Sequence, residues 1–145
     1  MFRSTIALMG ALAVGLAGCS ASIGPPGAAT NEEQTRRAAV AAQAQYPKDK
    51  KAQTDVNLTA LVNQNNQTIR LVNGTDQLIR DAKVWVNGAY VANIDRIPPH
   101  GIATLKFSDF YDTGGMSLAG QNAGIRNVEI DAEQGFYRVS NPTFE

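Results

Sequence analysis

The fold of this chain is decided by residues 78–97, which read LIRDAKVWVNGAYVANIDRI. The first half of this stretch alternates along the chain as a β-strand does. The two faces of that strand would carry Ala82, Val84 and Val86 on one side and Asp81, Lys83 and Trp85 on the other. Asn87-Gly88 is a favoured hairpin turn, and residues 90–97 form the returning strand. The stretch therefore predicts a β-hairpin.

The register of this hairpin has two alternatives. A two-residue turn would pair Trp85 with Tyr90 and Val84 with Val91, which places Asn93 on the apolar face. A loop one residue longer gives one wholly apolar face, with the pairs Val86–Tyr90, Val84–Ala92 and Ala82–Ile94. A slip of one residue turns every side chain to the opposite face. We therefore expect the longer loop, although the turn dipeptide favours the shorter one.

Further strands are predicted on both sides of the hairpin, at residues 67–73, 102–108, 125–131 and 136–141. The first of them places Ile69 and Leu71 on one face. Residues 73–76 have turn chemistry, and Pro98-Pro99-His100-Gly101 predicts a stiff corner. Residues 109–124 form a long Gly-rich loop, which we expect Phe110, Met116 and Leu118 to hold against the domain.

Six or seven short strands at roughly ten-residue spacing favour a mainly β fold, a small antiparallel β-sandwich or half-barrel over residues 56–145. Residues 69–107 resemble the immunoglobulin- and fibronectin-like domains of bacterial surface lipoproteins. The Cys…Trp…Cys pattern of true immunoglobulin domains is missing from the sequence. The resemblance implies an architecture and no activity.

A short Ala-rich helix is predicted at about residues 32–45. Asn31 has the character of an N-cap, Glu32 and Glu33 suit the first turn, and Pro47 ends the helix. Its apolar residues are almost all Ala, so it has little to bury and could act as a spacer. The small, uncharged residues 20–30 before it, with two Pro and two Gly, predict a linker. Residues 19–55 are thus expected to lie outside the β domain.

The amino-terminal residues 1–18 have the composition of a secretory signal. Arg3 is followed by an apolar run, Ile6–Leu16, which is shorter than the roughly 20 residues that span a bilayer. The tetrad Leu16-Ala17-Gly18-Cys19 resembles the lipobox of bacterial lipoproteins. An ordinary secreted protein with a stray cysteine is the alternative.

The lipobox resemblance implies cleavage between Gly18 and Cys19 and a diacylglyceryl group on the Cys19 sulfur. It also implies an acyl chain, such as palmitate, on the freed amine. Two or more chains anchor a protein stably to a membrane, whereas one gives marginal binding. By the same resemblance, Ser20 after the cysteine favours the outer over the inner membrane of the cell envelope.

Charge and cysteine content argue against nucleic-acid binding and against a disulfide. The chain has 13 Lys and Arg and 13 Asp and Glu, and losing Arg3 with the signal leaves 12 against 13, a net charge of −1. Such a balance provides no basic field for nucleic acid. With the one cysteine lipidated, no disulfide can form.

The candidate catalytic and metal-binding residues lack the partners and motifs that such sites need. His100 is the one histidine, and a hydrolase would need it beside Ser108 or Ser117 and Asp109 or Asp112, without a Gly-x-Ser-x-Gly elbow. One His cannot build a zinc cage, and Asp109 to Gly115 lacks the alternating carboxylates of a calcium loop. Glu129, Asp131 and Glu133 alternate on a strand face that we expect to be solvated. We therefore predict no catalytic residue, no metal site, no cofactor and no enzymatic activity.

The best binding candidates are aromatic: Trp85, Tyr90 and Tyr111, with Tyr137 beside them. An exposed Trp with Tyr neighbours can stack on a sugar ring or a protein partner. Alternatively, both faces of the sheet are covered and Trp85 belongs to the core. The sequence thus predicts a lipid-anchored envelope protein that acts as a non-enzymatic interaction or accessory module. A glycan- or peptidoglycan-binding module is the alternative.

Overall fold

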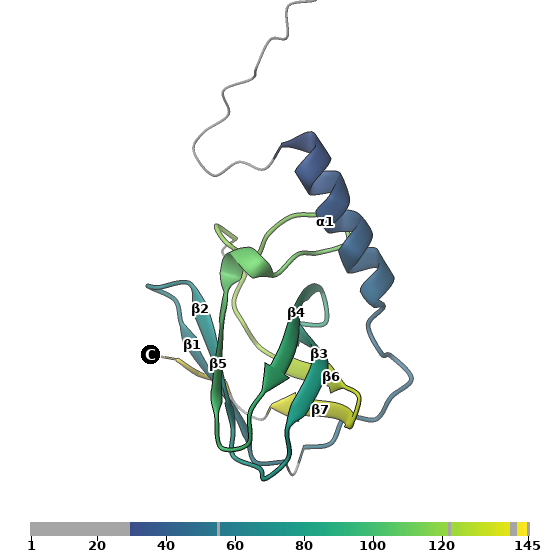
Figure 1. Cartoon of the computed structure of the whole chain (residues 1–145). Coiled ribbons are helices and arrows are strands. Elements are labelled where there is room, and N and C mark those ends of the chain that lie inside the picture. The colour runs from purple at the N-terminus through teal and green to yellow at the C-terminus, as the bar shows by residue number, and fades with distance from the viewer. Residues whose placement is uncertain (1–29, 55, 122, 140–141, 145) are drawn as a thin grey trace, which may run out of the picture.

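The computed structural model describes residues 30–54, 56–121, 123–139 and 142–144. In these residues, two four-stranded sheets pack face to face, and one helix lies at one end of them (Figure 1). One sheet has the order β5-β2-β1-β8 and the other β4-β3-β6-β7. The strands are β1 (Leu58–Asn63), β2 (Thr68–Asn73), β3 (Ile79–Val86), β4 (Tyr90–Ile97), β5 (Ile102–Lys106), β6 (Val128–Ala132), β7 (Gly135–Val139) and β8 (Thr143–Phe144).

The expected small, mainly β sandwich is therefore confirmed. Its pairs are antiparallel with one exception, because the short β8 runs parallel to β1 and pairs Leu61 with Thr143. β1 and β8 have no individual counterpart among the strands expected from the sequence. β5 is shorter than expected, since the chain turns into the 3₁₀ helix η1 (Phe107–Asp109).

The hairpin of β3 and β4 has the longer loop, as expected. Val86 pairs with Tyr90, Val84 with Ala92 and Ala82 with Ile94. Asn87 and Gly88 adopt φ values of 54° and 65°, and the Ala89 N–H donates to the Val86 carbonyl at 3.1 Å. The favoured turn dipeptide and the apolar register are both kept, because Ala89 is an extra residue between the turn and the ladder.

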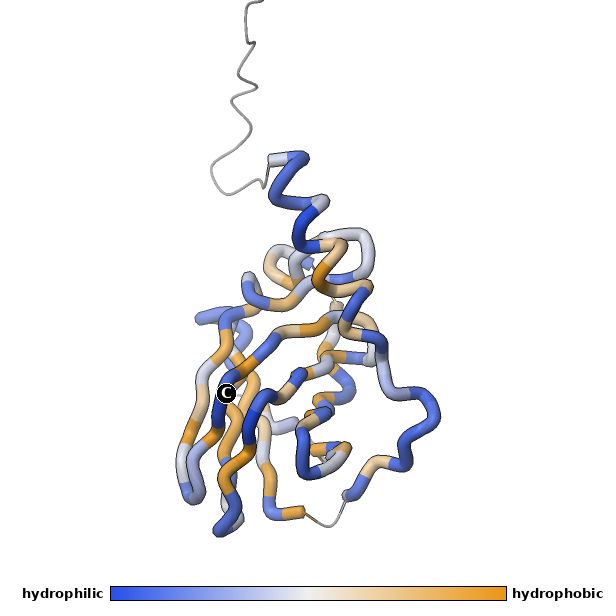
Figure 2. The backbone as a smooth tube through the Cα atoms, turned by 45° about the vertical axis from the view of Figure 1, so that its right-hand side comes forward, coloured by the Kyte–Doolittle hydropathy of each residue, from blue (hydrophilic) through white to orange (hydrophobic). Residues whose placement is uncertain are grey.

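The core lies between the two sheets, and in Figure 2 the strands carry hydrophobic residues along their length. Ile69, Leu71, Val84 and Ile130 are all at most 1 % exposed. Ile79 shares this core although strict alternation from Ala82 would turn it outward. Asp81, between them, has a φ of 46°, a left-handed conformation that interrupts the alternation. This kink turns Ile79 toward the space between the sheets.

The side chain of Asn87 explains why β6 begins later than expected. Its Oδ1 accepts from the backbone N–H groups of Arg126 and Asn127, at 2.8 and 3.2 Å, and its Nδ2 donates to the Gly124 carbonyl at 2.9 Å. Backbone donors held by a side chain are not available to a strand ladder. The strand consequently starts at Val128, although Ile125, in the segment before it, is buried.

The predicted helix is α1 (Asn31–Ala44), and its N-cap is Thr30, not Asn31 as expected. The Thr30 hydroxyl accepts from the Glu33 N–H at 3.3 Å, so the cap lies one residue earlier. α1 is not a free spacer. Ala41 and Ala44 are 3 % and 8 % exposed and pack against Trp85 and Val91 of the β4-β3-β6-β7 sheet.

The segment after α1, residues 45–54, runs along the same sheet to its β7 edge. There the Gln53 N–H donates to the Phe136 carbonyl at 2.8 Å, and the Arg138 N–H donates to the Gln53 carbonyl at 2.9 Å. This segment, called the strap below, covers an edge that would otherwise expose unpaired backbone groups.

The loop at 109–124 is held to the domain by two of the three side chains expected to do so. Phe110 and Leu118 are 0 % and 1 % exposed, whereas Met116 is 47 % exposed and lies at the surface. The expectation for Met116 was wrong because the loop turns back on itself: the Asp112 carboxylate accepts from the N–H groups of Gly114 and Met116. Met116 instead receives a hydrogen bond on its sulfur from Gln34 of α1 at 3.4 Å.

Candidate binding pocket

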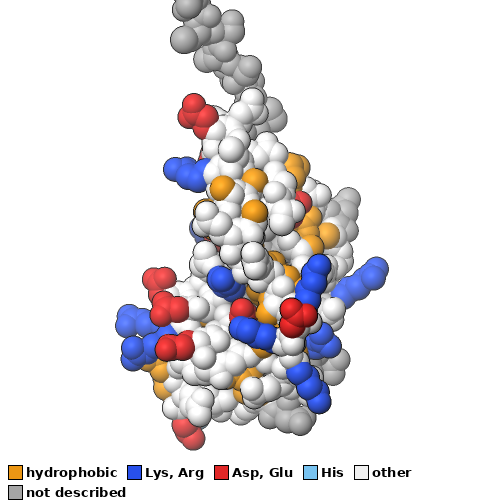
Figure 3. All heavy atoms as spheres, turned by 90° about the vertical axis from the view of Figure 1, so that its right-hand side faces the viewer, with side chains coloured by type: hydrophobic (Ala, Val, Ile, Leu, Met, Phe, Trp, Pro, Cys, Tyr) orange, Lys and Arg blue, Asp and Glu red, His pale blue; other side chains and the backbone are white. Residues whose placement is uncertain are grey.

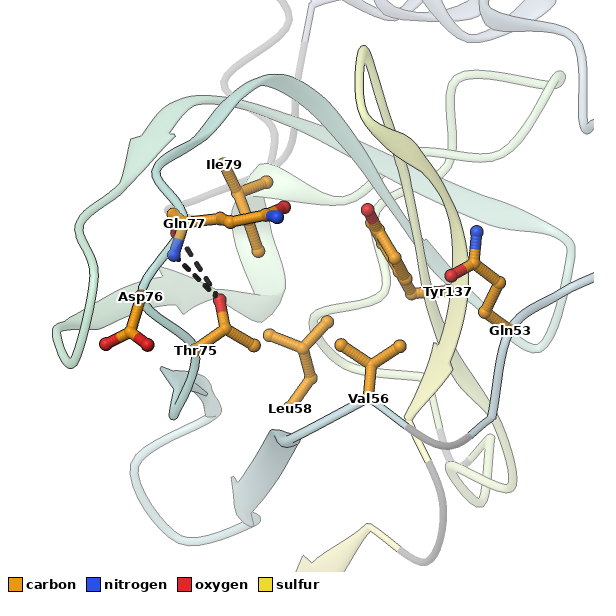
Figure 4. Close-up of a pocket in the computed structure, with 8 residues that line it drawn as sticks. All are labelled: Gln53, Val56, Leu58, Thr75, Asp76, Gln77, Ile79 and Tyr137. Atoms are coloured by element: carbon orange, nitrogen blue, oxygen red, sulfur yellow. Dashed lines mark hydrogen bonds between the residues drawn. The ribbon is translucent and has the colours of Figure 1, made fainter.

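A pocket of about 400 Å³ opens between the sheets, at the end of the sandwich where β1 and β3 begin (Figure 4). Its lining comes from four parts of the chain that meet only in the fold: the strap, the start of β1, the β2–β3 turn with the start of β3, and β7. The lining residues are Gln53, Val56, Leu58, Thr75, Asp76, Gln77, Ile79 and Tyr137.

The floor of the pocket is apolar. Leu58 and Ile79 are 7 % and 4 % exposed and belong to the main core, and the half-buried Val56 packs against it. Ile79 reaches this position through the kink at Asp81 described above. A floor fixed by core packing is formed before any ligand arrives, as is usual for small-molecule sites.

The walls of the pocket carry polar groups without partners. Within the described part of the chain, no hydrogen bond engages the side-chain amides of Gln53 and Gln77 or the Tyr137 hydroxyl. Figure 4 shows the Gln77 amide and the Tyr137 hydroxyl turned toward the space between them, with Gln53 beside Tyr137. Each amide can both donate and accept, and a phenol does both through one oxygen. Three groups that can each donate and accept hydrogen bonds therefore line the pocket.

The β2–β3 turn that forms one wall is rigidly held by Asn73. This side chain is fully buried, and its Nδ2 donates to the carbonyls of Gln77 and Pro98 at 2.7 and 3.0 Å. Its Oδ1 accepts from the N–H and the hydroxyl of Thr75 at 3.1 and 2.7 Å. The turn chemistry expected at 73–76 is confirmed, and it fixes the backbone that presents Thr75, Asp76 and Gln77.

His100 lies at the rim, as an exposed residue of the corner expected at 98–101. Its Nε2 lies 2.7 Å from Asp76 Oδ1, with the two side chains 64 % and 96 % exposed. A contact between two side chains so exposed contributes little to stability. Of the two serines considered as its partner, Ser117 donates instead to the Phe107 carbonyl at 3.2 Å.

Trp85 lies beneath α1 and the strap, and is 4 % exposed. The Tyr46 ring meets it edge to face, with ring centroids 5.3 Å apart and planes at 84°. Both faces of this sheet are thus covered, which is the core alternative set out above. The indole Nε1 is buried with no hydrogen-bond partner among the described residues. Such an orphan donor costs about 1–3 kcal/mol.

The two tyrosines named with Trp85 are half-buried and lie in different clusters. Tyr90 packs against the main core, whereas Tyr111 packs beside Trp85 and Val91. The Arg37 guanidinium of α1 stacks over the Tyr111 ring, 4.6 Å from its centroid. Tyr137, the fourth aromatic candidate, lines the pocket.

The expectation of a solvated face at Glu129 was wrong, because the strap covers it. Glu129 is 2 % exposed; it accepts from the Tyr46 hydroxyl at 2.6 Å and from Arg138 Nε at 2.8 Å. Burial raises the pKa of the Tyr46 phenol above its usual value, and the hydrogen bond to Glu129 raises it further. The bond to Glu129 likewise raises the pKa of Arg138. Nearby, Lys50 of the strap pairs with Asp131 at 2.7 Å.

The rest of the surface described carries charges of both signs. On the face shown in Figure 3, Lys and Arg side chains lie among Asp and Glu side chains below the helix. In the described ranges, no group of three or more His, Cys, Asp or Glu residues is placed to hold a metal ion. Gly18 and Cys19 lie outside the described residues.

No protein-family model matches the chain, and neither the curated proteins nor the solved structures contain a match to it. Sequence reasoning identified Tyr137 as a binding candidate but missed its pocket partners Gln53 and Gln77. Single glutamines beside a strand carry no pattern that marks them, and only the meeting of strap, turn and β7 brings them together.

Proposed function

We propose that the protein is a lipid-anchored protein of the bacterial envelope whose β domain serves as a non-enzymatic interaction or accessory module. The tetrad Leu16-Ala17-Gly18-Cys19, at the end of a signal-like segment that holds the sole cysteine, is the observation that carries this proposal. The thiol would hold a diacylglyceryl group, and the amine freed by cleavage would hold a further acyl chain. Ser20 favours the outer membrane as the site of attachment.

Chain length supports a short tether between the anchor and the domain. Ten residues separate Cys19 from Thr30, the N-cap of α1. Fully extended, ten residues span at most about 35 Å. Because α1 packs on the sheet through Ala41 and Ala44, the tether would end at Thr30, and the start of α1 would stay within this distance of the membrane.

No helix in the described ranges is long and apolar enough to cross a membrane.

The contacts of the possible catalytic residues support an interaction role over a hydrolytic one. The His100 ring is bonded to Asp76 and the Ser117 hydroxyl to a backbone carbonyl, so each is engaged with a different neighbour. Glycan binding through an exposed Trp85, the second candidate, is disfavoured by the cover that α1 and Tyr46 form over that ring.

Metabolic labelling with radioactive palmitate tests the proposal in the native host. We expect label on the wild-type chain and in the membrane fraction, and neither on a Cys19→Ser chain. A Ser20→Ala variant is the matched control, since it changes the neighbour and keeps the thiol. Equal labelling of wild type and Cys19→Ser, or no label on either, would leave an unanchored secreted domain.

A further inference from the structure

We propose that the pocket between Tyr137 and the Thr75–Gln77 turn binds one neutral, N-acetylated sugar unit. The inference goes beyond the proposed function, because it concerns the β domain alone and does not depend on the anchor at Cys19. Four properties of the pocket support it: its size and apolar floor, its polar groups without partners, its charge, and the strand edges around it.

Size and floor suit a single ring. The cavity of about 400 Å³ falls within the range of about 300–1,000 Å³ that small-molecule sites occupy. Val56, Leu58 and Ile79 offer methyl groups at its base. A ligand that fits must therefore bring a small apolar group as well as polar ones. An acetamido methyl and the C–H face of a sugar ring provide such groups.

The polar walls suit a ligand with several donors and acceptors. The amides of Gln53 and Gln77 and the Tyr137 hydroxyl are free of partners among the described residues, as shown above. They can donate to a carbonyl oxygen and accept from hydroxyl and amide hydrogens of the same ligand. An N-acetylated sugar provides all of these groups on one rigid ring, so little entropy is lost when it binds.

Charge favours a neutral ligand. Asp76 lies at the rim, and no Lys or Arg is among the described residues that line the cavity. An acidic sugar would meet the Asp76 carboxylate without a cation to compensate, which disfavours it.

The strand edges around the pocket argue against an extended peptide. A peptide that binds as an added strand needs a free sheet edge. Of the strands that line the cavity, β3 lies between β4 and β6, and β1 lies between β2 and β8, which pairs with Leu61 and Val62 beyond the cavity. β7 is paired with β6 on one side and with Gln53 of the strap on the other. Recognition at β3 and β7 must therefore use side chains.

Titration of the full-length, lipidated protein in detergent micelles with N-acetylglucosamine tests the inference, read by ligand-observed NMR. We expect saturable binding with a Kd of about 1 mM, the strength of a few hydrogen bonds on a small ligand. Glucose, which lacks the acetamido group, should bind about fivefold more weakly, the effect of one net hydrogen bond. Glucuronate should bind more weakly still.

Variants assign the binding to this pocket. Gln77→Ala and Tyr137→Phe should each weaken binding about fivefold. Gln64→Ala, which removes an exposed amide at the β1–β2 turn, is the matched control and should bind as wild type does. Gln77 is exposed, so its truncation keeps the fold even if Tyr137→Phe perturbs it. No saturation with N-acetylglucosamine, unchanged affinity in Gln77→Ala, or tighter binding of an uncharged N-acetylated tripeptide would overturn the inference.

Discussion

Asn73 shows how a single buried amide can determine the geometry of a site. Its side chain, 0 % exposed, joins the β2–β3 turn to the corner after β4 through the carbonyls of Gln77 and Pro98. An Asn at this position could be predicted as a turn residue, because Asn-Gly-Thr-Asp is turn chemistry. Its burial could not, because the partner carbonyl at Pro98 lies 25 residues away.

Replacing Asn73 should therefore be costly. Asn73→Ala leaves the carbonyls of Gln77 and Pro98 without their donor, and we expect a loss of about 2–4 kcal/mol in the free energy of unfolding. Urea denaturation measures it. Asn66→Ala, an exposed Asn in the β1–β2 turn, is the control and should lose less than about 0.5 kcal/mol. Similar losses in the two variants would contradict this role for Asn73.

Tyr46 gives the fold a sensitivity to alkaline pH. Its pKa is raised by burial and by Glu129, so the neutral phenol is favoured in the folded state. This contribution is complete below pH about 10, where the unfolded chain begins to ionise, and is lost as pH rises through the folded pKa. Tyr46→Phe should lower stability by about 1–2 kcal/mol at pH 7 and should flatten the alkaline decline.

Free energies of unfolding at pH 8 and pH 11 measure the alkaline decline. Tyr90→Phe controls for the loss of a phenol as such. An equal decline in wild type and Tyr46→Phe would show that Tyr46 does not titrate as the structure requires.

The environment of Glu129 could not be predicted from its own strand. The alternation of Glu129 with Asp131 and Glu133 is typical of a solvated strand face. The prediction of an exposed Glu129 was wrong because Tyr46, 83 residues earlier in the chain, covers this side chain. The sequence feature that points to the burial of Glu129 lies in the strap. There an aromatic residue, Tyr46, directly follows a helix whose apolar side chains are almost all Ala.

At the scale of elements, α1 acts as a cover. It hides Trp85, the only tryptophan, under Ala41 and Ala44, and the small side chains let the helix approach the ring closely. The helix itself could be predicted from its Ala content, its first-turn glutamates and the following Pro47, although its N-cap lies one residue earlier than expected. Its docking could not, since a face of Ala gives no amphipathic signal and the contact is made by the aromatic residues on the other side.

Disrupting this contact should expose the indole. Ala41→Glu places a charge against Trp85, and we expect a red-shifted emission maximum, stronger acrylamide quenching and a loss of about 1–3 kcal/mol. Ala42→Glu is the matched control, because Ala42 is exposed on the same helix and should leave the emission unchanged. Unchanged emission in Ala41→Glu would mean that α1 does not cover Trp85 in solution.

The loop at 109–124 supports the helix through Gly115. Its φ is 75°, and a Cβ there would run into the Gln34 carbonyl of α1. Gly115→Ala should thus be destabilised by about 2–4 kcal/mol, from backbone strain together with the clash. Gly120→Ala has a similar φ of 78° and open space around it, so it reports the strain alone. Urea denaturation of both variants measures the difference, and equal losses would show that the loop does not contact the helix there.

For the whole molecule, the α1 contact and the pocket lie at opposite ends of β3. α1 contacts Trp85 near the end of β3, whereas the pocket includes Ile79 at its start. Six residues of strand separate them, about 20 Å. With α1 toward the membrane, the pocket would face away from it, where a soluble or polymeric ligand can reach it.

The sandwich itself could be predicted because the sequence features that specify it are local. They are the alternation of apolar residues, the turn dipeptides and the apolar register of one hairpin. The pocket could not, because it depends on how the strap, the β2–β3 turn and β7 meet, and on a kink at Asp81 that breaks the alternation. Segments outside the strands, here α1 and the strap, determine which sheet faces and cavities remain exposed to solvent.

The mature amino terminus tests the central claim most directly. Mass spectrometry of the protein purified from its native envelope should find a first peptide that starts at Cys19 and carries the mass of a diacylglyceryl group, with or without a further acyl chain. A first peptide that starts at any other residue, or a Cys19 with a free thiol, would contradict the account.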